Sequence, residues 1–342
     1  MTPPLAQREL GRTGLGVCTL GFGSAGIGNL YRVLPDEDAA QAVRESFAGG
    51  VRYFDTAPFY GFGLSELRLG AVLREAASLP VISTKVGRRL VPTGPQDQNT
   101  GRHGYFSPRP FAPVFDYGYD SVMRSHEQSL ERLGVKRVDI LLCHDIGRLT
   151  HGEQHGARVR EFLEGGYRAL RELRDSGQVR AIGLGVNESE VCVELLAHCE
   201  LDCILLAGRY TLLEQPSLEE LLPLCVRRGV SILCGGPFNS GILATGARPG
   251  ATFFYVEAEA EVMARTRRIE TVCARHRVAI AAAALQFPLA HPAVSSVVTG
   301  MCNPAEAQQN LAHLRAAIPA DFWRELKTEG LIAEAAPVPA GL

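Results

Sequence analysis

The segment VRYFDTAPFYG, residues 51–61, joins a short apolar run to a carboxylate and a tyrosine. Residues 51–54 have the composition of a buried strand, Asp55 ends the run, and Tyr60 follows in a loop. Two later apolar runs end in a similar way, PVISTK at Lys85 and VDILLCH at His144. The fold and the candidate site can both be inferred from these three predicted strand ends.

Short apolar runs alternate with longer amphipathic segments along the whole chain. Eight strands are predicted, at residues 19–22, 51–54, 80–84, 138–143, 179–184, 202–206, 230–234 and 295–298. The predicted helices cover residues 37–48, 64–74, 121–133, 158–175, 188–198, 217–228, 258–275 with 279–289, and 304–316. Eight such units with no linker between them favour an α/β fold, a (β/α)₈ TIM barrel in a single domain over residues 1–342. A doubly wound sheet is the alternative.

Three further segments stand outside this repeating pattern. RELGRTGLGVCTL, residues 8–20, is expected to form a β-hairpin that turns at residues 11–16 and closes the bottom of the barrel. Residues 87–118 are rich in Gly, Pro, Arg and aromatic side chains, and residues 145–156 form a polar, His-containing loop. Both insertions follow strands, so we expect long βα loops at the C-terminal face, where barrels of this kind build their active sites.

The composition excludes several classes of function. The chain has 342 residues with a formal net charge of -2 and no basic stripe, so neither nucleic acid nor an anionic membrane is an expected partner. Its apolar stretches are shorter than the ~18 residues of a membrane helix. The start, MTPPLAQREL, lacks the apolar core of a secretory signal. We therefore expect a cytoplasmic protein with a small-molecule substrate.

The cysteines and histidines do not predict a metal site. Nine cysteines without a CxxC pair suggest reduced thiols. Cys199 and Cys203 are four residues apart, but Cys203 lies where a strand is predicted to begin. His144, His151 and His155 share one predicted loop without the spacing typical of metal ligands.

GFGSAG, residues 21–26, matches the glycine pattern of dinucleotide-binding folds. In those folds a helix must begin at once, so that its N-terminus meets the pyrophosphate. Here GIGNLYRVLPDED follows, with more glycine and a proline before any predicted helix. We interpret the motif as a flexible first βα loop whose backbone passes close to another group. That group can still be a cofactor.

Asp55, Lys85 and His144 end consecutive strands, so in a barrel they lie side by side on one rim, with Tyr60 close by. The chemistry that fits is proton transfer by tyrosine. A free phenol titrates near ~10, and moving its pKa toward 7 takes roughly 4 kcal/mol. Lys85 is expected to lower that pKa, while Asp55 holds Lys85 protonated.

In this interpretation Tyr60 is a general acid or base, and His144 orients the substrate oxygen. None of the four side chains is a good hydride source, so a nicotinamide cofactor is expected to carry that step.

These residues resemble the Asp-Tyr-Lys-His tetrad of the aldo-keto reductases. The opening RELGRTGL with TLGFGSAG, and VVTGMCNPAEAQQN near the C-terminus, are similar to segments of that family. The resemblance implies a (β/α)₈ barrel that binds NAD(P)H in an extended form. It places Gly23, Ser24, Ala25 and Asp55 near the nicotinamide ribose and Asn187 at the carboxamide. It also implies that Pro237, Asn239 and Gly241 line the pyrophosphate. By the same resemblance, Gln309 and Asn310 contact the adenine.

The chain departs from the family pattern at three places. Gly235 stands where many members have an aromatic residue stacked on the nicotinamide, and Ala207 replaces a carboxamide-holding glutamine. Gly300 and Met301 occupy the positions of a Lys and a Ser that bind the 2′-phosphate of NADP, and Glu306 that of an Arg. A carboxylate repels a phosphate and can accept a hydrogen bond from a ribose hydroxyl, so NAD is the expected cofactor and NADP the alternative. The alternative interpretation is that Glu306 is a solvated residue in the first turn of a helix.

HDIGRLTHG and LLAGRYTLLEQ look like the bacterial branch of the family that contains L-fucose (D-threo-aldose) 1-dehydrogenases and pyridoxal 4-dehydrogenase. The resemblance implies oxidation of the anomeric carbon of an aldose to a lactone. The alternatives are pyridoxal 4-dehydrogenase, a general NADPH-dependent aldehyde or ketone reductase, and a non-catalytic cofactor-sensing barrel.

Overall fold

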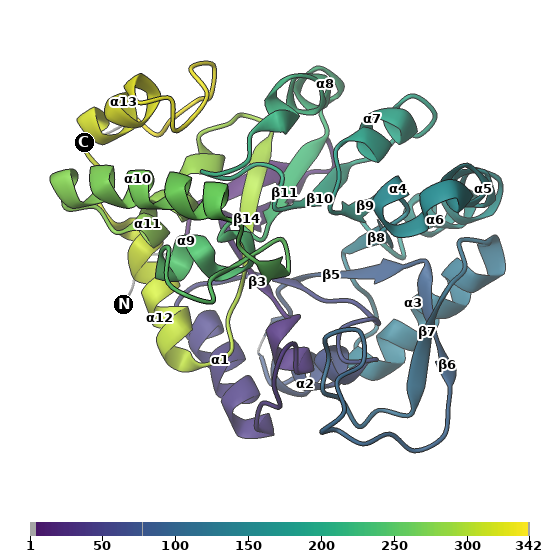
Figure 1. Cartoon of the computed structure of the whole chain (residues 1–342). Coiled ribbons are helices and arrows are strands. Elements are labelled where there is room, and N and C mark those ends of the chain that lie inside the picture. The colour runs from purple at the N-terminus through teal and green to yellow at the C-terminus, as the bar shows by residue number, and fades with distance from the viewer. Residues whose placement is uncertain (1–4, 77, 341–342) are drawn as a thin grey trace.

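Eight parallel strands form a closed barrel with helices around it in the computed structural model, which describes residues 5–76 and 78–340 (Figure 1). In hydrogen-bonded order the strands are β3 (Leu20–Gly23), β4 (Tyr53–Asp55), β5 (Val81–Val86), β8 (Ile140–His144), β9 (Ala181–Val186), β10 (Cys203–Ala207), β11 (Ser231–Gly235) and β14 (Val294–Gly300). Strand β14 pairs with β3 and closes the ring. The predicted TIM barrel is confirmed, because each apolar run is buried between the barrel interior and an outer helix.

The outer ring consists of amphipathic helices. They are α1 (Asp36–Ala48), α2 (Leu64–Leu73), α3 (Tyr119–Leu133), α6 (Tyr167–Asp175), α7 (Glu190–Leu196), α8 (Leu221–Arg228), α10 (Ala260–His276), α11 (Ile280–Leu289), α12 (Pro304–Arg315) and α13 (Ala320–Thr328). Helix α13 was not predicted, although Phe322, Trp323 and Leu326 give it a fully apolar inner face.

The helix predicted over residues 158–175 is divided in the structure. It comprises α5 (His155–Glu161), a π-helical turn at Phe162–Gly166 and then α6. A Cβ atom at Gly166 would lie 2.4 Å from the Tyr117 carbonyl oxygen, so glycine permits the close approach of this turn to the start of α3. Single π-turns of this kind interrupt otherwise regular α-helices.

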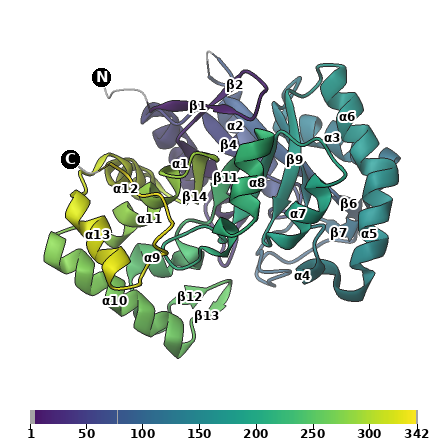
Figure 2. The same ribbon diagram turned by 90° about the horizontal axis from the view of Figure 1, so that it is seen from above.

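The N-terminal hairpin is confirmed as β1 (Gln7–Leu10) paired with β2 (Leu15–Cys18). The Gly11 N–H donates to the Ser231 hydroxyl at 2.7 Å, and the Ser295 hydroxyl donates to the Glu9 carbonyl at 3.0 Å. Ser231 and Ser295 stand at the starts of β11 and β14, so the hairpin covers the N-terminal end of the barrel. Figure 2 shows it at the end opposite to β12 and β13.

The insertions at the C-terminal face contain more regular structure than the sequence suggested. Residues 87–118 include an antiparallel hairpin of β6 (Arg88–Pro92) and β7 (Phe111–Phe115). The segment predicted as a polar loop at residues 145–156 instead forms α4 (Arg148–His151), a 3₁₀ turn (Gly152–Gln154) and the start of α5. After β11 come a 3₁₀ turn (Asn239–Gly241), α9 (Ile242–Thr245) and a short hairpin of β12 (Thr252–Phe253) and β13 (Val256–Glu257).

Candidate active site

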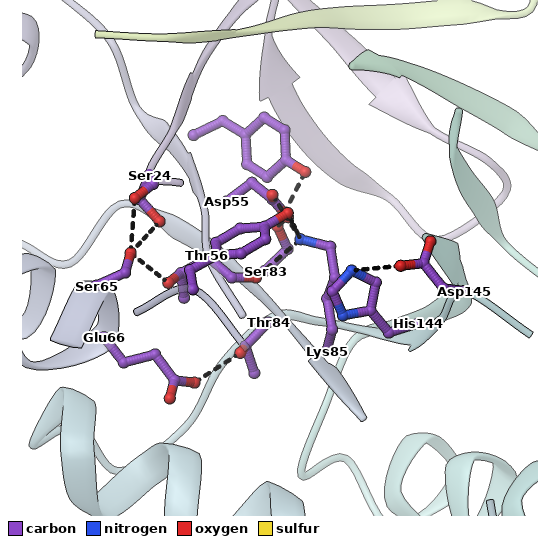
Figure 3. Close-up of polar contacts among 12 residues, drawn as sticks. Ser24, Asp55, Thr56, Ser65, Glu66, Ser83, Thr84, Lys85, His144 and Asp145 are labelled. Carbon is purple, nitrogen blue, oxygen red and sulfur yellow. Dashed lines mark hydrogen bonds and ion pairs between the residues drawn. The ribbon is translucent and has the colours of Figure 1, made fainter. Parts of the chain in front are cut away.

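A buried ion pair forms the centre of the candidate site. Asp55 is the last residue of β4 and Lys85 lies near the end of the neighbouring strand β5. Lys85 Nζ lies 2.7 Å from Asp55 Oδ2 and donates to the Thr56 carbonyl oxygen at 2.9 Å (Figure 3). The Ser83 hydroxyl donates to the other carboxylate oxygen at 2.6 Å. The side chains of Lys85 and Asp55 are exposed by only 1% and 4%. Buried charges need an opposite charge and hydrogen-bond partners, and both residues have them.

Tyr60 reaches the same ammonium from the loop between β4 and α2. Lys85 Nζ donates to the Tyr60 hydroxyl oxygen at 3.1 Å. The loop is held by close backbone approach, because a Cβ atom at Gly28 would lie 2.9 Å from the Tyr60 carbonyl carbon. The Ser107 hydroxyl of the long insertion donates to the Gly61 carbonyl at 2.7 Å. The insertion therefore helps to position the tyrosine, a role that its composition did not reveal.

The protonation of Tyr60 differs from the expectation. Burial raises the pKa of this phenol well above its usual range, and the Asp55 carboxylate raises it further. The expected net shift of this pKa toward 7 is not found. Desolvation of the phenolate outweighs the nearby ammonium, which is itself paired with Asp55.

His144 completes the group of four predicted residues at the end of β8. Its ring meets the Tyr60 ring edge to face, with 6.0 Å between centroids. Burial, with the nearby charges of Arg88 and Lys85, lowers the pKa of His144 well below its usual range, so the ring is neutral. Its Nδ1 atom has no hydrogen-bond partner among the described residues. A neutral imidazole can donate one hydrogen bond to a substrate oxygen.

A cavity of about 450 Å³ opens beside Tyr60, Lys85 and His144. This volume suits a small ligand. Its charged and amide lining residues beyond those three are Arg88, Asp145 and Asn187. The rest of the wall is mostly apolar and aromatic, formed by Ala25, Leu30, Tyr31, Phe59, His103, Tyr105, Val186, Leu205, Ala207 and Tyr255. A Cβ atom at Gly185 would lie 3.1 Å from Lys85 Cε, so glycine keeps this side of the cavity open.

The residues predicted to contact a cofactor stand at the C-terminal ends of β3, β9, β11 and β14. Gly23 is in register with Gly300 on one side and with Asp55 on the other. Ser24 and Ala25 follow Gly23, and the Ser24 N–H donates to the Asp55 carbonyl at 3.0 Å. The residues Asn187, Pro237, Asn239 and Gly241 follow β9 and β11. A smaller cavity beside Asn239 shares Asn187, Ala207 and Tyr255 with the large one.

The α12 end of the predicted cofactor region has an additional structural role. Glu306 accepts hydrogen bonds from the Cys302 N–H and the Asn303 amide, both at 2.7 Å. Asn303 in turn accepts from the Glu306 N–H at 2.9 Å, so the two residues form a reciprocal helix cap. Asn310 is buried and donates to the Thr299 hydroxyl at 2.9 Å, whereas Gln309 is exposed. The structural role of Glu306 is thus to cap α12, and that of Asn310 is to attach α12 to β14. The cofactor contacts of both residues remain predictions.

Comparison with known proteins identifies the family. The model of the Aldo/keto reductase family matches residues 19–328. This chain belongs to the aldo/keto reductase family. As an aldo/keto reductase it is an oxidoreductase, and the family uses nicotinamide cofactors. Within the described residues, no group of three or more His, Cys, Asp and Glu side chains is arranged to hold a metal ion.

Two curated relatives cover nearly the whole of this aldo/keto reductase. It is 45% identical to the pyridoxal 4-dehydrogenase of Microbacterium luteolum over 335 residues, or 95% of this chain and 98% of that protein. It is 38% identical to a D-threo-aldose 1-dehydrogenase of Pseudomonas sp over 324 residues, or 93% and 96%.

A solved aldo-keto reductase of Bacillus halodurans in its holo form superposes with a TM-score of 0.74. That structure is 24% identical and covers 98% of both chains, which supports the fold. In the part of this chain that the structure describes, no helix has the length and apolar character needed to cross a membrane.

Proposed function

We propose that this aldo/keto reductase oxidises a cyclic hemiacetal to a lactone with NAD⁺, Tyr60 being the general acid–base. The observation that carries the proposal is the joint position of Tyr60, Lys85 and His144 on one cavity wall. A bound NAD⁺ would supply the hydride acceptor for the hemiacetal carbon and a positive charge that would favour the phenolate. The residues predicted to hold it are Gly23, Ser24, Ala25 and Asp55 near the ribose, with Asn187 and the segment after β11 further along.

The tetrad residues supply the proton chemistry. The phenolate form of Tyr60 accepts the proton of the anomeric hydroxyl group as the C–H bond breaks and the C=O bond forms. His144, being neutral, donates a hydrogen bond to the same oxygen and orients it. Lys85 donates to the Tyr60 oxygen at 3.1 Å and so stabilises the phenolate as it forms. Asp55 and Thr56 hold the ammonium in place.

The cavity wall favours a flat aromatic hemiacetal of the pyridoxal type. Tyr31, Phe59, Tyr105 and Tyr255 offer faces and edges for stacking. Among the described residues outside the tetrad, the charged and amide groups on this wall belong to Arg88, Asp145 and Asn187, and these are already bonded to one another. The relative at 45% identity is a pyridoxal 4-dehydrogenase, which also supports pyridoxal over an aldose as the substrate. Aldoses are the second candidate because the relative at 38% acts on D-threo-aldoses.

Initial rates followed by nicotinamide absorbance test the proposal. NAD⁺ and NADP⁺ are each supplied with pyridoxal, L-fucose, D-arabinose and L-galactose. We expect turnover with NAD⁺, and a higher kcat/KM for pyridoxal than for any aldose. A higher value for an aldose would reverse the substrate order and leave the hemiacetal chemistry intact. No turnover on the panel, together with reduction of simple aldehydes by NADPH, would disprove both the cofactor and the substrate assignment.

A further inference from the structure

Asp145, which follows His144 directly, has an unusual backbone and a buried side chain. Its φ is +46°, in the left-handed region that aspartate tolerates better than most residues. The Asp145 N–H donates to the Gly185 carbonyl at 2.9 Å, and its own carbonyl accepts from the Tyr117 hydroxyl at 3.1 Å. These bonds hold the residue in this conformation, with its carboxylate beside His144 (Figure 3).

The carboxylate of Asp145 contacts residues from three different elements. Its Oδ2 atom pairs with Arg88 at 2.6 Å, at the start of the β6–β7 hairpin. Its Oδ1 atom accepts from the Asn187 amide nitrogen at 3.0 Å, just after β9. Its Oδ2 atom also lies 3.5 Å from His144 Nε2, at the end of β8. All four residues line the large cavity, so one side chain connects three of its walls.

Each contact fixes an orientation that the neighbour alone would not have. A carboxylate only accepts hydrogen bonds, so the Asn187 nitrogen faces Asp145 and its carbonyl oxygen is directed elsewhere. The same charge favours the His144 tautomer that carries its proton on Nε2. At 3.5 Å that proton is not consumed by a short hydrogen bond and stays available to a substrate oxygen.

Arg88 fixes the carboxylate in turn. Its guanidinium group lies 4.2 Å from the centroid of the Phe59 ring and 4.8 Å from that of Phe115. Two ring faces therefore restrain the arginine, which restrains Asp145 through an ion pair with side chains exposed by only 14% and 9%.

We propose that Asp145 is a positioning residue that orients Asn187 toward the cofactor and His144 toward the substrate from one carboxylate. The part of the proposal that concerns His144 and the substrate rests on the proposed function. The cofactor side can be measured without any substrate, because NADH binding includes the contact of Asn187 and needs no hemiacetal.

The first variant is Asp145→Asn, which keeps the size and removes the charge. We expect kcat with the best hemiacetal to fall by roughly 100-fold, as small misplacements in active sites can cause. We also expect the Kd for NADH, measured by fluorescence titration, to rise by about tenfold, the size expected when a hydrogen bond to a charged group is lost. The control is Asp116→Asn, which removes a pair with Arg89 at 3.1 Å on the same hairpin but outside the cavity lining. It should leave kcat and Kd unchanged.

A double-variant cycle separates positioning from a general structural role. If Asp145 acts on the cofactor through Asn187, the Asn187→Ala and Asp145→Asn changes combined should bind NADH no more weakly than Asn187→Ala alone. Losses that multiply in the double variant would overturn the proposal, as would an unchanged Kd in Asp145→Asn.

A third variant covers the case in which Asp145→Asn does not fold. Arg88→Met releases the carboxylate without removing it and should weaken NADH binding in the same direction, and normal binding there would overturn the proposal. A protein that binds NADH as expected and oxidises no hemiacetal would refute the proposed function instead. The two failures are therefore distinguishable.

Discussion

Lys85 Nζ lies 3.1 Å from the Tyr60 hydroxyl oxygen, and the same ammonium lies 2.7 Å from the Asp55 carboxylate. One buried cation therefore bridges the acid–base candidate and its own counter-ion. Burial of the phenol is the main reason why its pKa is raised although a cation touches its oxygen, and the Asp55 carboxylate raises it further. Lys85 therefore holds the phenol hydroxyl in place and, in the proposed mechanism, would stabilise the phenolate.

Tyr60→Phe should abolish turnover and preserve cofactor binding. The phenylalanine ring keeps the packing against Tyr105 and His144 and lacks only the hydroxyl group. We expect kcat to fall by about 10³-fold, within the range for loss of a general acid–base group. Tyr119→Phe is the control, since that hydroxyl donates to Glu172 on the outer helices at 2.6 Å. Full activity in Tyr60→Phe would exclude Tyr60 as the proton carrier.

The rate of oxidation should rise with pH. In the proposed mechanism the phenolate is the active base, and burial raises the pKa of Tyr60 well above its usual range, so the active form grows as the pH increases. Reduction uses the neutral phenol and should change little from neutral to mildly alkaline pH. Rate measurements in both directions over this range check the prediction, and an oxidation rate that falls on the alkaline side would contradict it.

Asp55→Asn should destabilise the fold as well as the activity. It leaves the Lys85 ammonium, exposed by only 1%, without its counter-ion, a change that typically costs about 3–5 kcal/mol. Adding Lys85→Met removes the unpaired charge and should restore part of the free energy of unfolding. Urea denaturation of the single and double variants measures both effects. Asp175→Asn, in a solvent-exposed pair with Arg171, is the control and should change stability little.

Glu306→Gln should shift cofactor preference toward NADP while keeping the main cap of α12. The N–H of residue 306 still donates to Asn303, so the main helix cap is kept, while glutamine has one acceptor oxygen and retains only one of the two hydrogen bonds that Glu306 accepts from Cys302 and Asn303. Loss of the negative charge removes repulsion of a 2′-phosphate, and we expect kcat/KM with NADP⁺ to rise while that with NAD⁺ stays nearly constant. An unchanged ratio of the two values would mean that Glu306 only caps the helix.

Stability should decrease as the pH falls below the usual titration range of histidine. Burial lowers the native-state pKa of several histidines, namely His126, His144, His151, His291 and His313. The unfolded chain binds protons at these sites near pH ~6.5, before the native state does, so protonation favours unfolding below that value. Urea midpoints measured from neutral to mildly acidic pH check this. His126→Gln, which removes one titrating site outside the cavity lining, should make the decrease less steep.

Much of the fold and the tetrad could be predicted because they depend on local patterns. Eight apolar runs alternating with amphipathic segments are typical of a parallel barrel. The C-terminal ends of its strands share one rim, so Asp55, Lys85 and His144 had to be neighbours. Tyr60 follows Asp55 by only five residues, so the short connection keeps it at the same rim. These inferences need only periodicity and the order of the strands.

Other features depended on contacts between distant segments. Arg88, Asp145 and Asn187 meet in space although they come from β6, the end of β8 and the end of β9. The hairpin of β6 and β7 and the helical start of the His-containing insertion were likewise not predicted. A hydrogen bond between side chains tens of residues apart leaves no periodic signal in the sequence.

The sequence by itself determined which chemical groups stand on the rim of the barrel. Only the tertiary structure decided their protonation, because burial and pairing are properties of the folded environment. Tyr60 demonstrates the difference. The presence of a cation beside it was predictable, but the raised pKa follows from the desolvation of the phenol and from the Asp55 carboxylate that pairs with Lys85.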